Sequence, residues 1–266
     1  TARDKHINVL LLGVDDGDEE NPGGPRRSDT IMLASVDNDG NAINLLSIPR
    51  DTRVNIPGYK ETDKINHAFF YGEAPLAVKT VEDFLNVPVD HYLVVDWQAF
   101  IRLVDILGGV DIYVEHEMAY DDPYADLHIK LSRGYQHLNG QQAGQYVRFR
   151  HDELGDIGRV QRQQRFAKAL TAQLMTAGTI VKIPQIITTL RKNVSTDMNA
   201  YDMIKLAVST RLYRPVPLNA EMLPGNFATI NGYSYWEPDR ESTKQVVNRF
   251  FKPATGQLSG VFNSGR

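Results

Sequence analysis

The first hydrophobic segment, His6 to Gly13 (HINVLLLG), restricts the fold of this chain more than any other stretch. Its continuous aliphatic character is typical of a buried strand. The next two hydrophobic segments, Thr30 to Val36 and Ala42 to Ile48, flank the sequence DNDG. Because residues of that type tolerate positive φ, the two segments predict a β-hairpin, and we expect all three strands to lie in one sheet.

Helical and strand-like patterns then alternate along the chain. Apolar residues at helical spacing predict one helix between Ile65 and Leu85 and a second between Trp97 and Leu107, with a strand at Asp90 to Val95 between them. This alternation predicts the α/β class, as a three-layer α/β/α sandwich around a central mixed β-sheet. No repeat or linker divides the sequence, so we expect residues 1–266 to form a single domain.

Composition excludes several classes of protein. The net charge of −4 argues against a general nucleic-acid binder, whose surface would be basic. The absence of cysteine excludes disulfides, thiolate zinc sites and a cysteine nucleophile. The sequence has no GK[ST] phosphate loop, no GxSxG elbow and no HExxH helix, which disfavours Walker-type NTPases, serine hydrolases and zinc proteases. No apolar run reaches the roughly 18 residues of a membrane-spanning helix.

An arginine-rich segment stands out against this acidic background, between Tyr146 and Arg165 (YVRFRHDELGDIGRVQRQQR). Arginine offers a planar fork of donors that suits phosphate and pyrophosphate oxygens, so the cluster predicts an anion site. The alternation in YVRFR predicts a strand with Arg148 and Arg150 on one face. That arrangement is costly unless an anion or carboxylates lie beside the two side chains.

A helix is predicted from Arg159 onward. Arg159 and Gln163 fall on one face of this helix, and its N-terminus would add its own dipole to an anion site. For Arg162, Arg165 and Lys168 we favour a solvated helix face.

Charged residues also follow the predicted strands. Asp15 comes after the first strand, Asp29 begins the second, and Arg50 and Asp51 follow the third. Loops at strand ends build the ligand sites of open α/β sheets, so these segments are expected to meet. Asp15 and Asp29 have the chemistry to hold one Mg²⁺, and the alternative is that they cap turns. For Arg50 the alternative is a salt bridge with a nearby acid such as Asp51.

Seven motifs occur in an order that resembles the LytR–CpsA–Psr family of cell-wall glycopolymer phosphotransferases. They are GVDD, RRSDTIML, LLSIPRDTRV, DKINHAFFYG, DHYLVVDW, LGGVDI and YVRFRHDELGDIGRVQRQQ. The resemblance runs from about Asn8 to beyond Gln164, and the later MLPG and YSYWEPD are similar to the C-terminal end of the family. Single motifs are weak indicators, whereas the ordered set is a strong one.

The resemblance implies an extracytoplasmic enzyme, anchored in the bacterial cytoplasmic membrane by a segment outside this chain. Such an enzyme transfers a glycopolymer phosphate (a teichoic acid, capsular or other wall polysaccharide) from a polyprenyl-pyrophosphate carrier to peptidoglycan. By motif, Asp15 and Asp29 would hold Mg²⁺ as the cofactor. The pyrophosphate would be bound by Arg27, Arg50, Arg148, Arg150, Arg159 and Gln163. Phosphoryl transfer depends mainly on positioning and charge neutralisation, which these residues supply.

Three points stay open from sequence alone. Asp29 or Asp51 would accept the proton of the incoming hydroxyl, and the sequence does not choose between them. Gly17 and an acidic stretch stand where the family often has an arginine, so Arg26 or Arg53 would supply that phosphate contact. The family's hydrophobic lipid groove would be lined by residues of the predicted helices, among them Phe69, Phe84, Phe100 and Val104.

Two other functions are compatible with parts of the pattern. A non-catalytic scaffold that binds polyprenyl pyrophosphates would use the same arginines without turnover. A DNA-binding regulator fits worst, because the net charge is −4 and no helix-turn-helix pattern is present.

Overall fold

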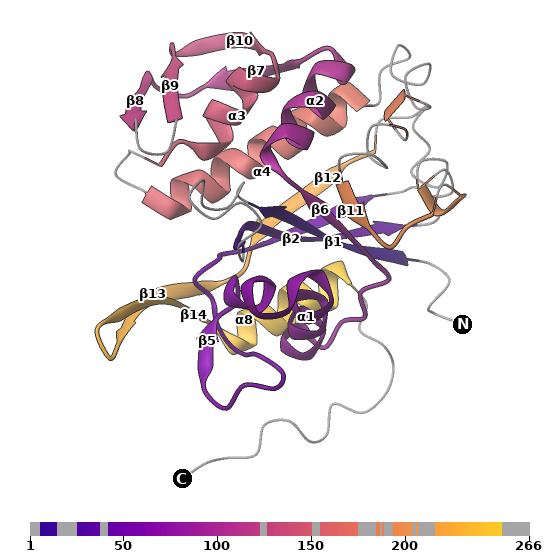
Figure 1. Ribbon diagram of the computed structural model, residues 1–266, viewed down its shortest axis with the longest axis vertical. Helices are drawn as coiled ribbons and strands as arrows, with labels where there is room; N and C mark the ends of the chain where they lie inside the picture. Colours follow the sequence, from indigo (N-terminus) through magenta and orange to yellow (C-terminus); the bar gives the residue numbers. More distant parts are fainter. Residues whose placement is uncertain are drawn as a thin grey trace.

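The computed structural model describes residues 6–14, 26–37, 42–122, 127–150, 155–174, 185–186, 188, 194–199, 201–203, 206 and 216–251. Its centre is a six-stranded sheet (Figure 1). In spatial order the strands are β11 (Val194–Thr196), β6 (His91–Val95), β1 (His6–Val14), β2 (Ser28–Asp37), β3 (Ile43–Ile48) and β12 (Leu218–Met222).

The pairing of these strands makes the sheet mixed. Strand β2 is antiparallel to both β1 and β3, which confirms the predicted hairpin and the shared sheet. Strands β6 and β12 lie parallel to β1 and β3, and β11 is antiparallel to β6. Of the predicted turn, Asp37 to Gly40, Asp37 is the last residue of β2, and residues 38–40 lie outside the described residues.

One face of the sheet is covered by helices α1 (His67–Leu85) and α8 (Arg240–Phe250) (Figure 1). Helix α1 is interrupted at Gly72 and Glu73, whose backbone angles are not helical, and Pro75 lies in the first turn after this break. The helix ends at Asn86, which adopts the left-handed conformation. The helix predicted between Ile65 and Leu85 is therefore confirmed, with a kink that the apolar spacing alone does not indicate.

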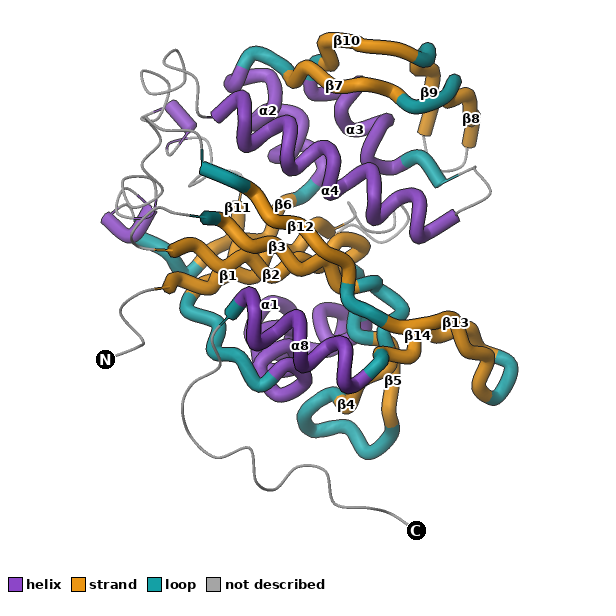
Figure 2. The backbone as a smooth tube through the Cα atoms, turned by 180° about the vertical axis from the view of Figure 1, so that it is seen from behind, coloured by secondary structure: helices purple, strands orange, loops and turns teal. Residues whose placement is uncertain are grey.

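The other face carries helices α2 (Trp97–Leu107), α3 (Gly140–Arg148) and α4 (Gly155–Leu174) (Figures 1 and 2). Helix α2 confirms the helix predicted between Trp97 and Leu107. It begins at an Asp96 cap that accepts a hydrogen bond from the Ala99 amide, and it ends at Gly108 in the left-handed conformation. The three-layer prediction is confirmed.

Four antiparallel two-stranded pairs complete the fold. The pairs β7–β10 and β8–β9 lie beyond the layer of α2 to α4, and β13–β14 projects from the side of the molecule near β4–β5 (Figure 2). The strands are β4 (Arg53–Asn55), β5 (Thr62–Lys64), β7 (Val110–Val114), β8 (Met118–Asp122), β9 (Leu127–Leu131), β10 (Gly134–Leu138), β13 (Gly225–Ile230) and β14 (Tyr233–Pro238).

Alternation along the central strands divides the core between the two faces. On β3, Leu46 packs with the residues of α1 and α8, whereas the neighbouring Leu45 packs on the opposite face with Ala167 of α4. Strand β1 is buried in the same alternating way, with Leu10 toward α1 and Leu11 toward α4. Burial on both faces explains the continuous aliphatic run of this strand.

Candidate active site

The candidate site lies at one edge of the central sheet, where β1 ends, β2 begins and β3 ends. Gly13 is paired with Thr30, and Ile31 with Ile48, so the residues that follow β1 and β3 converge on the start of β2. A Cβ atom on Gly13 would lie 2.9 Å from the Cβ of Thr30, so glycine allows the two strand ends to approach closely. The sequence prediction that the segments of Asp29 and Arg50 meet is confirmed by this register and by the contact between these two side chains.

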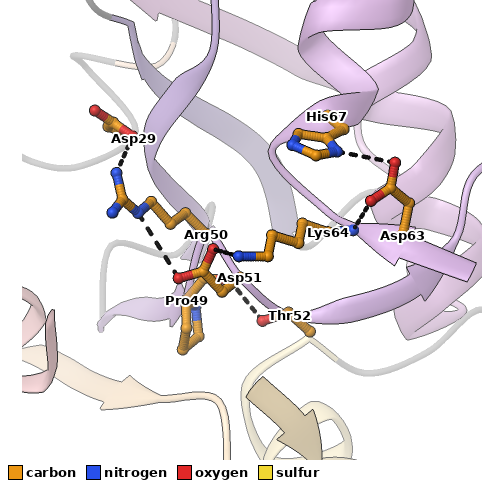
Figure 3. Close-up of polar contacts among 8 residues, drawn as sticks. All are labelled: Asp29, Pro49, Arg50, Asp51, Thr52, Asp63, Lys64 and His67. Carbon is orange, nitrogen blue, oxygen red and sulfur yellow. Dashed lines mark hydrogen bonds and ion pairs between the residues drawn. The ribbon is translucent and has the colours of Figure 1, made fainter. Parts of the chain in front are cut away.

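Four charged side chains form an ionic network at this edge, namely Asp29, Arg50, Asp51 and Lys64 (Figure 3). Arg50 Nη1 donates to Asp29 Oδ1 at 2.7 Å, and its Nε lies 3.9 Å from Asp51 Oδ2. Lys64 Nζ lies 2.9 Å from Asp51 Oδ1. The network contains two cations and two carboxylates, so its formal charge is balanced.

Backbone hydrogen bonds fix the segment that carries Arg50 and Asp51. The Asn66 amide donates to the Arg50 carbonyl, and the Ile65 amide donates to the Thr52 carbonyl. The Thr52 hydroxyl closes the turn by donating to the Pro49 carbonyl at 2.6 Å. The entry into α1 is thereby tied to the end of β3, which places Lys64 beside Asp51. Lys64 is therefore part of the network.

Helix α4 covers the same strand ends from the other face of the sheet. Gln163 Nε2 donates to the Thr30 hydroxyl at 2.9 Å, and Gln164 Nε2 donates to the Ser47 hydroxyl at 3.1 Å. Arg159, one turn before Gln163, is buried. Because Thr30 directly follows Asp29, these contacts place the first half of α4 against the start of β2.

The predicted strand at YVRFR is wrong. Tyr146 to Arg148 end helix α3, which begins with a capping box between Asn139 and Gln142 and buries residues at helical spacing. Arg148 therefore does not share a strand face with Arg150. Its guanidinium instead lies over the Trp97 ring, 3.6 Å from the ring centroid, and Arg150 follows the helix as an exposed residue.

The solvated position expected for Arg162 is also wrong, because its side chain is only 1% exposed. Arg162 belongs to a Glu115 cluster, which also contains Tyr146 and Arg165. Its Nη2 donates to the Phe149 carbonyl at 2.6 Å, and its Nη1 donates to Glu115 Oε1 at 3.3 Å. Arg165 forms an ion pair with the same oxygen from a half-exposed position, and Lys168 is exposed as expected.

Tyr146 is held by the same carboxylate. Its hydroxyl donates to Glu115 Oε2 at 3.0 Å, and its side chain is fully buried. Burial together with the negative charge of Glu115 raises the pKa of Tyr146 to about 12. The cluster thus fixes helix α3, helix α4 and the Phe149 backbone between Arg148 and Arg150.

The two remaining predicted arginines have different neighbours. Arg27 lies over the Phe70 ring, 5.4 Å from its centroid, and is two residues from Asp29. Arg53 is held by Thr62 and by Glu237, whose Oε2 lies 3.4 Å from its Nη1. Arg27 therefore borders the ionic network, whereas Arg53 is tied to β5 and the β14 hairpin.

The two predicted metal ligands can be followed only in part. Asp15 lies outside the described residues. Asp29 is described, and its carboxylate is 41% exposed. Within the described ranges, no group of three or more histidine, aspartate or glutamate side chains gathers as a preformed metal site. The oxygen chemistry of Asp29 nevertheless fits a hard cation such as Mg²⁺.

The residues expected to line a lipid groove are not brought together. Phe69 and Phe84 pack into the core beneath the sheet, with Phe69 buried. Phe100 and Val104 belong to the core between α2 and the β7–β10 region, on the opposite face, and Val104 is fully buried. No helix in the described part of the chain has the length and hydrophobicity that spanning a bilayer requires.

One contact in this region, between Asp63 and His67, was not predicted from the sequence. Asp63 and His67 lie four residues apart, and His67 Nδ1 is 2.8 Å from Asp63 Oδ2 (Figure 3). The spacing in DKINH was the available signal, because residues at that separation meet where a helix begins.

Comparison with known proteins assigns this arrangement to a family. The model of the LytR_cpsA_psr family matches residues 1–252, and the chain therefore belongs to the LytR–CpsA–Psr family. Two relatives named polyisoprenyl-teichoic acid–peptidoglycan teichoic acid transferase TagU are about one third identical. The protein of Enterococcus faecalis is 33% identical over 244 residues, covering 90% of this chain and 77% of the relative. That of Halalkalibacterium halodurans is 35% identical over 250 residues, with coverage of 90% and 76%.

Solved structures show the same fold. The crystal structure of B. subtilis TagV is 28% identical, with a TM-score of 0.79 and coverage of 94% of this chain and 98% of TagV. TagT bound to LIIa-WTA is also 28% identical, with a TM-score of 0.74 and coverage of 92% and 91%. The mixed α/β architecture described above is thus the fold of this family.

Proposed function

We propose that this chain is a transferase that moves a glycopolymer, of the teichoic acid or related wall-polymer type, from a polyprenyl-pyrophosphate carrier to peptidoglycan. The names of the related TagU proteins and the TagT complex with LIIa-WTA support the class of donor and acceptor. The membership of this chain in the family supports the transfer to peptidoglycan.

The ionic network of Asp29, Arg50, Asp51 and Lys64 is the observation that carries the proposal. All four side chains are at least one fifth exposed, so their charges remain accessible to a ligand. A pyrophosphate adds negative charge to a network that is already balanced. Its binding therefore requires the further cations that border the site, and strong charge neutralisation is the main protein contribution to phosphoryl transfer.

Each cation has a separate role in this proposal. Arg50 donates a planar fork to the pyrophosphate oxygens from the end of β3, while Lys64 holds Asp51 in place. Arg27 approaches from the start of β2, and Arg159 with Gln163 approaches from α4. Arg148 at the end of α3, Arg150 two residues later and Arg53 at the start of β4 are proposed as outer contacts with the same ligand.

Mg²⁺ is proposed as the cofactor. Asp29, with its half-exposed carboxylate oxygens, and Asp15, which follows β1, would hold the ion. When bound, Mg²⁺ supplies positive charge that lowers the cost of placing a pyrophosphate beside two aspartates. Two further features of the family are proposed for the native protein, an extracytoplasmic location and a membrane anchor outside this chain.

The direct test is a transfer assay with purified protein. The protein is incubated with a teichoic acid polymer on a polyprenyl-pyrophosphate carrier and with peptidoglycan glycan strands, with Mg²⁺ or with a chelator. We expect covalently linked polymer that disappears with the chelator, and E. faecalis TagU under the same conditions serves as the positive control. The proposal would be contradicted if TagU formed linked polymer and this chain formed none. If this chain released only free polymer, it would be reassigned as a hydrolase.

A further inference from the structure

An exposed aromatic surface lies next to the ionic network. Tyr59, Phe70 and Tyr71 are 47%, 37% and 39% exposed, although side chains of this size are normally more buried. Tyr59 and Tyr71 stack with their ring centroids 4.4 Å apart, and Phe70 meets Tyr71 edge to face at 5.6 Å. The three rings come from the loop after β4 and the first turn of α1, so they form one continuous surface.

The polar groups beside these rings are arranged around Asp63. Its carboxylate accepts hydrogen bonds from the Tyr71 hydroxyl at 2.9 Å, from the Lys64 amide at 2.7 Å and from His67 Nδ1 at 2.8 Å. Burial raises the pKa of Asp63, but these hydrogen bonds outweigh it and the pKa lies below its ordinary value. Asp63 is therefore an acceptor at neutral pH, and it fixes both Tyr71 and the imidazole of His67.

The pairing with Asp63 decides what the other nitrogen of His67 can do. A carboxylate only accepts hydrogen bonds, so Nδ1 of His67 is the protonated nitrogen and Nε2 of the neutral ring is a proton acceptor. A histidine oriented by a carboxylate in this manner is a common arrangement for a general base.

This surface is continuous with the candidate pyrophosphate site. His67 directly follows Asn66, whose amide donates to the Arg50 carbonyl at 3.2 Å. Arg27 lies over Phe70, and the side chain next to Asp63, Lys64, reaches Asp51. Figure 3 shows the two groups in one view, with Lys64 extending from the Asp63–His67 side toward Asp51.

We propose that Tyr59, Tyr71, Asp63 and His67 form the acceptor saccharide subsite of this transferase, in which His67 Nε2 accepts the proton of the attacking hydroxyl. The inference rests on the proposed function and adds the location of the acceptor. Sugar rings present C–H faces that pack on aromatic rings, and their hydroxyl groups hydrogen bond to neighbouring polar side chains. The subsite supplies both kinds of contact, and neither Asp29 nor Asp51 is then needed as the base.

The chemical step is balanced without a further reactant. The O–H bond of the acceptor breaks, and its proton passes to His67 Nε2. The acceptor oxygen bonds to the donor phosphorus, and the bond from that phosphorus to the bridging oxygen breaks. Polyprenyl phosphate leaves with the electron pair of the broken bond. The titratable groups that contact His67 are Asp63 on β5 and Tyr71 on α1. The other charged groups of the neighbouring elements are Lys64 on β5, Arg50 and Asp51 after β3, and Arg27 before β2.

Two variants separate the roles within the subsite. His67→Gln is expected to lower kcat about 10²-fold and to remove the acidic limb of the pH–rate profile, because it deletes the proton acceptor. Tyr59→Ala is expected to raise the acceptor KM about tenfold while kcat changes little, because the stacked ring only contributes binding. Both variants are expected to bind a short-chain prenyl pyrophosphate as the wild type does, by native mass spectrometry.

Matched controls come from the opposite side of the molecule. His137 Nδ1 lies 2.7 Å from Asp111 Oδ1, so His137→Gln removes a similar His–Asp pair, and Tyr135→Ala removes a more exposed ring. Both controls are expected to leave kcat and the acceptor KM unchanged. Wild-type kcat and pH profile in His67→Gln, or an unchanged acceptor KM in Tyr59→Ala, would overturn the proposal.

Direct binding keeps this test independent of the proposed transfer. Isothermal titration calorimetry with a short peptide-free peptidoglycan oligosaccharide requires no turnover. Binding to the wild type that weakens about tenfold in Tyr59→Ala supports the subsite, even for a protein that transfers nothing. Equal binding by the wild type and Tyr59→Ala, or none by the wild type, overturns the subsite and leaves the donor site untouched.

Discussion

Two clusters in this molecule contain the same chemical groups but differ in how far those groups are exposed. The ionic network of Asp29, Arg50, Asp51 and Lys64 is partly exposed, and its charges face one another at the end of the sheet. In the Glu115 cluster, Arg162 is almost completely buried, and its donors are directed at Glu115 and a backbone carbonyl. The difference in burial and in the direction of the donors therefore separates Arg50, whose charge is accessible to a ligand, from Arg162, which holds helices together.

Truncation of Arg162 should give the largest change in stability. Arg162→Ala removes a buried partner of Glu115 and leaves the Phe149 carbonyl without this donor, so we expect a loss of about 3–5 kcal/mol of unfolding free energy. Arg165→Ala is the matched control, because Arg165 pairs with the same oxygen from the surface and should cost less than about 1 kcal/mol. Chemical denaturation measures both values. Similar denaturation midpoints for Arg162→Ala and Arg165→Ala would show that burial does not determine how much each arginine contributes to stability.

Tyr146 gives the Glu115 cluster a signature at alkaline pH. Its pKa in the folded state is about 12, above the ordinary value of 10.0, so the stabilising contribution is complete below pH 10 and is lost as the pH rises through 12. A difference of two pKa units corresponds to about 2–3 kcal/mol. In denaturation curves recorded from pH 10 to pH 12, we expect the unfolding free energy of Tyr146→Phe to fall less than that of the wild type, because the variant lacks this titrating group. An equal fall in unfolding free energy for the wild type and Tyr146→Phe would show that another group is responsible.

The stacking of Arg148 on Trp97 is the next contact to test. The space for the Trp97 ring exists because residue 144 is glycine, and a Cβ at that position would overlap with the ring. Gly144→Ala is therefore expected to cost about 1–3 kcal/mol and to displace Arg148. Thermal unfolding and donor binding check the two effects. Gly58→Ala is a useful comparison, because Gly58 has a positive φ but open space around it.

Lys64 should show the smallest effect on stability. Lys64→Met removes the ion pair with Asp51 from a partly exposed position, so we expect a loss below about 1 kcal/mol. Transfer should nevertheless slow about tenfold, because Asp51 then competes with the donor for Arg50. A large loss of stability in denaturation would place Lys64 with Arg162 among the structural residues.

Local patterns predicted most of the fold from sequence. The hairpin of β2 and β3 and its place with β1 in one sheet were predicted from hydrophobic runs and a turn sequence, and α1 and α2 were predicted from apolar residues at helical spacing. The alternation in YVRFR misled, because five residues are too few to distinguish a strand from a helix end whose cap lies at Asn139.

The site was predicted less completely, for a physical reason. Asp29 and Arg50 were recognisable because Asp29 lies at the start of β2 and Arg50 follows β3. These two strands pair, so the proximity of the two side chains is set by register. The burial of Arg162 depends on Glu115, which is 47 residues away, and no spacing in the sequence connects the two. The Asp63–His67 pair could have been predicted from the sequence, because both residues belong to one short segment.

The measurement that tests the account most directly compares transfer and stability in Arg50→Ala. We predict that the rate of transfer from the polyprenyl-pyrophosphate carrier to peptidoglycan falls about 10²–10³-fold, while the unfolding free energy changes by less than about 1 kcal/mol. Arg249→Ala is the control, because Arg249 of α8 forms an exposed pair with Glu221 of β12 that is not part of the ionic network. Transfer by Arg50→Ala at the wild-type rate would contradict the assignment of the ionic network as the active site.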